Sequence, residues 1–98
     1  MKYLDGFELL HNLIKKRWVP EILHSIKKGN DSYTSILNSI DYLSDTELNR
    51  KLRLLLDYKC IERREESSYK LTSFGDEMDH IFSHISDLGE RYVARLKA

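Results

Sequence analysis

The chain has 98 residues, of which 41% are hydrophobic and 33% charged, and its 16 basic and 16 acidic side chains give a formal net charge of zero. This composition excludes an intrinsically disordered chain, and the balanced charge argues against a protein that coats nucleic acid through bulk electrostatics. The single cysteine, Cys60, excludes a disulfide framework within the chain. A single domain of this length buries only about 60 to 65% of its unfolded surface, so a partner subunit would add stability.

The N-terminal segment gives no sign of export. Asp5 and Glu8 lie where a secretory signal peptide would be uniformly apolar. No apolar run approaches the roughly 18 residues of a membrane span. We therefore expect a cytoplasmic protein.

Two helices are predicted at the start of the chain. The first covers roughly residues 5–15, because apolar side chains recur at helical spacing there; its stripe consists of Leu4, Phe7, Leu10 and Ile14. The second covers about residues 18–28, since Pro20 is tolerated only in a first turn and Gly29 is a typical C-cap. Its buried face consists of Trp18, Ile22, Leu23 and Ile26.

A helix-turn-helix spacing follows. Ser32 or Asp31 can cap a short helix over residues 33–40, and residues 41–43 then connect it to Ser44. Ser44 and Glu47 have the spacing of a capping box, in which each side chain accepts a hydrogen bond from the backbone N–H of the other. A helix is therefore predicted from Ser44 to Asp57. Two helices joined by three or four residues are typical of a helix-turn-helix.

The helix over residues 44–57 has two different faces. Leu48, Leu52 and Leu55 recur at i, i+4 and i+7 and are expected to be buried. The opposite face carries four side chains suited to base edges, with arginine for guanine, asparagine for adenine and threonine for a thymine methyl; they are Thr46, Asn49, Arg50 and Arg53. Taken alone, this face is better explained as a solvated surface of mixed charge; the capping box, the short turn before it and the wing after it are what favour DNA binding.

The last third of the chain predicts a hairpin and a long helix. Residues 60–65 and 68–71 are expected to form two short antiparallel strands, and Thr72 can cap a helix over residues 73–96. At 1.5 Å per residue that helix is about 36 Å long, more than one small domain needs, so we expect its surplus apolar length to pack against another chain. The fold class is mainly α with a small β-hairpin wing, a winged helix-turn-helix over residues 1–98.

Contacts to phosphates would orient such a domain on DNA. The candidates are hydroxyl groups near helix starts and cations near the wing; they are Ser32, Tyr33, Ser35, Ser44, Lys51, Arg63, Arg64 and Lys70. Successive residues of a strand point to opposite faces, so at most one of Arg63 and Arg64 is expected to face DNA. The alternative for all of them is ordinary solvated surface.

The segment over residues 15–75 resembles the HxlR family of bacterial and archaeal transcriptional regulators. The resemblance is carried by Lys16 to Trp18, Ile22-Leu23, Gly29, Leu43-Ser44, Leu48, Leu52, Arg63 and Tyr69-x-Leu71-Thr72-x-x-Gly75, and it extends over roughly residues 7–90. It implies a homodimer, held by the first and last helices, in which the helix over residues 44–57 reads an inverted-repeat DNA operator. The expected interface residues are Leu4, Phe7, Leu10, Ile14, Ile81, Phe82, Ile85, Leu88 and Tyr92.

The sequence departs from the family pattern in three places. The cysteine that many members carry near the N-terminus is missing, Lys59-Cys60 replaces the usual Gly-Leu, and the wing lacks several residues. We therefore expect no thiol sensing by the usual cysteine and a short minor-groove reach. The resemblance specifies no effector.

Other chemistry has less support in the sequence. Cys60 is either a small buried hydrophobe or, with its pKa lowered by nearby cations, a redox site. His80 and His84 have the i, i+4 spacing of a metal pair, which His11 could join, but histidines on a surface or interface have the same spacing.

We predict no cofactor, no metal and no enzymatic activity, because phosphate loops and nucleophile motifs are missing. The alternative functions are a winged-helix module that binds proteins instead of DNA and, less favoured, a sensor with a small-molecule cleft between the terminal helices.

Overall fold

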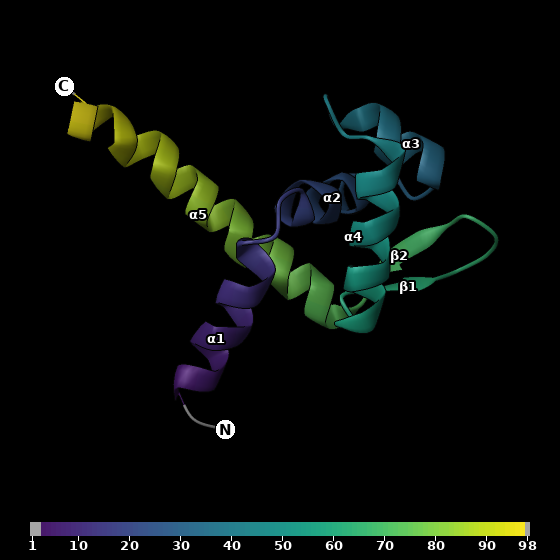
Figure 1. Ribbon diagram of the computed structural model, residues 1–98. Coiled ribbons are helices and arrows are strands. Elements are labelled where there is room, and N and C mark those ends of the chain that lie inside the picture. Colours follow the sequence, from purple (N-terminus) through teal and green to yellow (C-terminus); the bar gives the residue numbers. More distant parts are fainter. Residues whose placement is uncertain (1–2, 98) are drawn as a thin grey trace.

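The computed structural model describes residues 3–97, with side chains from residue 5 onward. Within that range the elements are α1 (Tyr3–Ile14), α2 (Val19–Lys27), α3 (Tyr33–Ser39), α4 (Asp45–Asp57), β1 (Ile61–Arg63), β2 (Tyr69–Leu71) and α5 (Ser73–Lys97). Figure 1 shows α2, α3, α4 and the hairpin gathered in one body, from which α1 and the far half of α5 extend. The predicted winged helix-turn-helix is confirmed.

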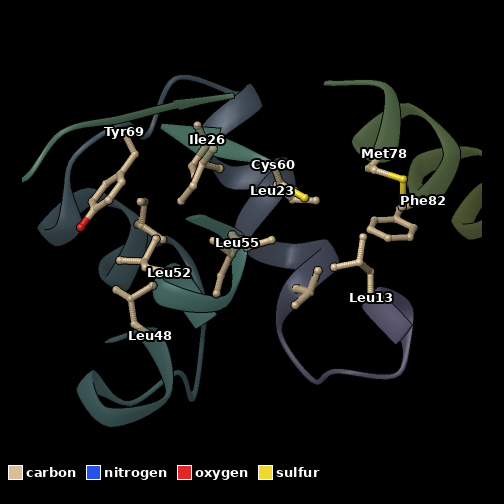
Figure 2. Packing of buried hydrophobic residues seen from close by; sticks show 14 of the residues in the cluster. Leu13, Leu23, Ile26, Leu48, Leu52, Leu55, Cys60, Tyr69, Met78 and Phe82 are labelled. Atoms are coloured by element: carbon tan, nitrogen blue, oxygen red, sulfur yellow. The ribbon is translucent and has the colours of Figure 1, made fainter. Parts of the chain in front are cut away.

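One apolar cluster holds this body together (Figure 2). From α4 it contains Leu48, Leu52 and Leu55, which are at most 3% exposed, so the predicted buried face is confirmed. From α5 it contains Phe82, which is 5% exposed and lies beside Leu13 in Figure 2. We expected Phe82 at a dimer interface, but its ring fills the core of its own chain, which leaves little surface for a second copy.

The helix caps follow the sequence in part. Ser44 caps α4 by accepting a hydrogen bond from the backbone N–H of Glu47 at 3.2 Å. The expected return bond from Glu47 is replaced by ion pairs of its carboxylate with Lys51 and Arg50. A complete capping box lies instead at the start of α3, where Ser32 and Ser35 each accept from the other's backbone N–H at 3.1 Å.

The ends of several elements differ from the prediction by one or two residues. α2 begins at Val19, not Trp18, because Trp18 adopts a left-handed backbone with φ 76°. α3 ends at Ser39, since Ile40 is already extended. β1 stops at Arg63, because residues 65–68 form a turn closed by the N–H of Ser68 on the carbonyl of Glu65 at 3.1 Å.

The wing is short but tied to the helices on one side. β1 and β2 pair antiparallel, with Arg63 opposite Tyr69. Beyond this pair, the N–H of Tyr33 donates to Ser67 O at 3.0 Å, and the N–H of Tyr69 donates to Asp31 O at 2.7 Å. The segment entering α3 therefore lies along the hairpin and fixes the wing to the helix-turn-helix.

The N-terminal end of α5 lies directly against the connection between α4 and β1. Thr72 caps the helix as predicted, accepting from the N–H of Gly75 at 3.1 Å. Gly75 is buried and faces the backbone of Cys60. No helix in residues 3–97 is long and apolar enough to cross a membrane.

Candidate nucleic-acid interface

The outward face of α4 consists of the four side chains expected to read bases. Thr46, Asn49, Arg50 and Arg53 are all exposed, opposite the buried leucines of the same helix. Ser44 holds the helix start, and the leucines fix its rotation, so the polar face has a defined direction. The predicted exposure is confirmed, while base reading by these residues stays a prediction.

Charges on α4 are partly paired with one another. The carboxylate of Glu47 lies 3.2 Å from the ammonium of Lys51 and 3.6 Å from the guanidinium of Arg50. The Lys51 side chain is only 14% exposed, whereas that of Arg50 is 72% exposed. Lys51 is therefore poorly placed for the phosphate contact that we expected of it. Arg53 is exposed and forms no ion pair with the residues that the structure describes.

The start of α3 is bonded to the start of α4. The hydroxyl of Tyr33 donates to the carboxylate of Asp45 at 2.8 Å. This hydrogen bond raises the pKa of the Tyr33 phenol above its usual value of 10.0. The hydroxyls of Ser32 and Ser35 are engaged in the capping box. The side chains of these three expected phosphate contacts are therefore committed within the protein, and so are their backbone N–H groups, which donate to Ser35 Oγ, Ser67 O and Ser32 Oγ.

The cations of the wing are exposed but each has a neighbour. Arg64 pairs with Asp31 at 3.7 Å, and Lys70 pairs with Glu62 at 3.0 Å. The guanidinium of Arg63 lies 5.5 Å from the ring centre of Tyr69. Exposed ion pairs of this kind are weak, about 0 to 1 kcal/mol, so a phosphate can replace the carboxylate partner at little cost.

Cys60 lies in the core, with no exposed surface. Burial raises its pKa to about 11. The alternative expectation of a lowered pKa and a reactive thiol is therefore wrong, and the interpretation as a small buried hydrophobe is favoured.

His80 and His84, which have the spacing of a metal pair, have no third ligand among the described residues. Among the described residues, no group of three histidine, cysteine or acidic side chains could hold a metal ion. His24, which the sequence analysis did not single out, has a carboxylate partner. Its Nδ1 atom lies 3.2 Å from Oδ1 of the buried Asp79. This contact joins α2 to α5 and supports the core beneath the helix-turn-helix.

A capped recognition helix with an outward polar face, a short turn before it and a wing beside it define a DNA-binding transcriptional regulator. The chain belongs to the HxlR-like helix-turn-helix family, whose model matches residues 13–97. The resemblance inferred from the sequence is thereby confirmed.

Solved structures of YodB from B. subtilis share this fold. The quinone-bound form has a TM-score of 0.79 and 24% identity, covering 94% of this chain and 100% of that one. The reduced form, described as a transcriptional regulator, has a TM-score of 0.76 and 23% identity, covering 94% of each chain. The diamide-treated form has a TM-score of 0.71 and 23% identity, covering 94% of this chain and 95% of that one. No match was found among the curated proteins.

Proposed function

We propose that the chain works as a homodimeric transcriptional regulator that binds an inverted-repeat operator, with α4 of each protomer in a major groove. The observation that carries this proposal is the outward face of α4, where two arginines and an asparagine lie opposite three buried leucines. Arg50 and Arg53 are suited to guanine and Asn49 to adenine. The wing cations would contact phosphates.

The terminal helices support the dimer. Phe7, Ile81, Ile85 and Tyr92 are 40 to 51% exposed, and Ile14 and Leu88 are 36 and 37% exposed. Leu10 is half-buried, and Leu4 lies outside the residues whose side chains are described. A second copy covering these side chains would remove from water an apolar stripe that the chain's own core covers only in part. A two-fold axis through these helices would place two recognition helices about one DNA turn, or a multiple of it, apart.

The dimer is tested by sedimentation at micromolar concentration. We expect twice the chain mass of 11.6 kDa. Ile85→Glu should sediment as a folded monomer, while Ser86→Glu, on the neighbouring exposed position of α5, should remain dimeric. Sedimentation of the unaltered chain as a monomer would refute the proposed assembly.

Operator binding is tested on duplexes recovered by selection from a random pool. Arg50→Ala and Arg53→Ala should each weaken binding by roughly 5- to 150-fold, corresponding to about 1 to 3 kcal/mol for a base contact. Lys15→Ala, which removes an exposed cation at the end of α1, is the control and should bind normally. Unchanged binding by both arginine variants would contradict the proposal.

The second candidate, a module that binds proteins, is favoured by the pairing of Lys51, Arg64 and Lys70 with carboxylates. Salt dependence separates the two functions. Each phosphate neutralised contributes about −0.9 to the slope of log K against log salt, so operator binding must show a steep slope. A module that binds only proteins would show no salt-dependent retention on duplex DNA.

A further inference from the structure

Tyr42, in the turn between α3 and α4, is more exposed than any other large hydrophobic side chain described. Its side chain is 95% exposed and its backbone is left-handed, with φ 70°. Residues other than glycine and asparagine rarely adopt this conformation, because the Cβ atom crowds the backbone. Both the exposure and the conformation are unfavourable for a tyrosine, so the fold itself gives no reason for this residue type.

The other non-glycine residues with positive φ in residues 3–97 each make a contact within the fold, one through its side chain and two through the backbone carbonyl. The Trp18 ring is half-buried and lies 4.6 Å below the guanidinium of Arg17. Lys59 O accepts a hydrogen bond from the Thr72 hydroxyl, and Ser67 O accepts one from the N–H of Tyr33. No described residue hydrogen-bonds or stacks on the Tyr42 side chain.

The turn itself is fixed by the neighbours of Tyr42. Leu43 is 8% exposed, and its N–H donates to Ile40 O at 3.4 Å. Ser44 then caps α4. Glycine or asparagine at position 42 would serve this turn at least as well, because both tolerate positive φ.

Tyr42 lies near the end of α4 that would approach DNA. It lies two residues before the N-cap of α4, and a recognition helix enters the major groove with its N-terminal residues foremost. At this end the hydroxyl of Tyr33 is already bonded to Asp45. Asp41 is exposed and acidic, so a cation here would be drawn to a carboxylate of the protein. A neutral phenol keeps its O–H for a phosphate oxygen.

We propose that Tyr42 contacts the sugar–phosphate backbone of the operator, with its hydroxyl donating to a phosphate and its ring packed on the adjacent sugar. This inference rests on the proposed function, because it needs α4 in the groove. Tyr42 is then a DNA contact contributed by the turn itself, beyond the outward face of α4.

The test uses the selected duplex, with binding measured by fluorescence anisotropy at several salt concentrations. Tyr42→Phe removes the hydroxyl, and Tyr42→Gly removes the whole side chain while relieving the backbone. We expect Tyr42→Phe to lose about 10- to 150-fold in affinity, as for a hydrogen bond to a charged group, and Tyr42→Gly to lose at least as much. The salt slope should stay unchanged, because tyrosine carries no charge. The melting temperature of Tyr42→Gly should equal or exceed that of the unaltered chain.

Lys59→Gly is the matched control, since it makes the same backbone change at the opposite end of α4 (Figure 1). It should bind the duplex within about twofold of the unaltered chain, as surface substitutions away from a site do. Equal losses for Lys59→Gly and Tyr42→Gly would overturn the inference. A fall in melting temperature that parallels the loss of affinity would also overturn it.

Three further outcomes separate this inference from the proposed function. If the unaltered chain selects no duplex, the proposed function fails and the Tyr42 contact fails with it. If the unaltered chain binds and both Tyr42 variants bind equally well, only the Tyr42 contact is refuted. Normal operator affinity of Tyr42→Gly, combined with lost regulation by purified polymerase on an operator template, would assign Tyr42 to a protein partner and overturn the DNA contact.

Discussion

Replacing Gly75 by alanine tests how closely α5 approaches the connection between α4 and the wing. A Cβ atom at position 75 would lie 1.9 Å from Cys60 O and 2.8 Å from its carbonyl carbon. Both are backbone atoms, and the same carbonyl accepts from the N–H of Thr72 at 3.0 Å. The clash can therefore be relieved only if α5 shifts away from Cys60 and this hydrogen bond is lost.

The magnitude follows from three contributions. Overpacking costs about 1 to 3 kcal/mol, and the lost hydrogen bond about 1 kcal/mol. Alanine returns up to about 1 kcal/mol of helix propensity relative to glycine. The net loss in free energy of unfolding is about 2 kcal/mol, which lowers the melting temperature of a domain this size by about 10 °C.

The assay is thermal unfolding followed by circular dichroism at one fixed protein concentration, because the melting temperature of a dimer depends on concentration. Gly89→Ala is the control, since a Cβ atom at position 89 of α5 meets nothing within 4 Å. It should be as stable as the unaltered chain, or more stable by up to about 1 kcal/mol. A normal melting temperature for Gly75→Ala, with Gly89→Ala behaving as expected, would show that the close approach is not a constraint.

Three further predictions concern single side chains. Cys60 should react slowly with a thiol reagent at about pH 8 in the native protein and rapidly in denaturant, because its pKa is about 11 and it is buried; rapid native labelling would contradict this. Tyr33→Phe should lower the free energy of unfolding by about 1 kcal/mol in denaturant titrations, since it loses the hydrogen bond to Asp45. Because folding raises the pKa of Tyr33, the phenol stabilises the folded state fully below about pH 10, and this stabilisation is lost as the pH rises further. The free energy of unfolding of Tyr33→Phe should therefore fall less steeply with pH in alkali than that of the unaltered chain. Lys51→Met should leave the salt slope of operator binding unchanged, as its ammonium pairs with Glu47; a slope smaller by about 0.9 would show that it reaches a phosphate.

Sequence reasoning succeeded where one local pattern determined the outcome. The leucines of α4 recur with the period of a helix, so their burial and the outward direction of Arg50 and Arg53 could be predicted together. The cap by Thr72 could be predicted for the same reason, since its partner Gly75 is three residues away.

It failed where packing between distant segments decided. Phe82 has the same helical spacing as the apolar residues that stay exposed on α5, and only its placement against α1 and α2 buries it. The Glu47 carboxylate had three possible partners, the N–H of Ser44 and the side chains of Arg50 and Lys51. The capping-box spacing favoured Ser44, whereas the structure pairs Glu47 with the two cations. The exposure of Tyr42 had a signal in the sequence, an aromatic residue two positions before a helix cap, but helical periodicity gives no information about such a residue.

The hydrogen bonds that join the wing to the segment entering α3 affect the entropy of DNA binding. A long wing that is mobile in the free protein must be ordered by DNA, and each side chain immobilised costs about 0.5 to 1.5 kcal/mol. Here Ser67 and Tyr69 are already bonded to Tyr33 and Asp31 before any DNA arrives. The short wing extends less far toward DNA than a long one would, but its residues are already ordered when the protein folds. Association with an operator therefore requires little further loss of conformational entropy from the wing.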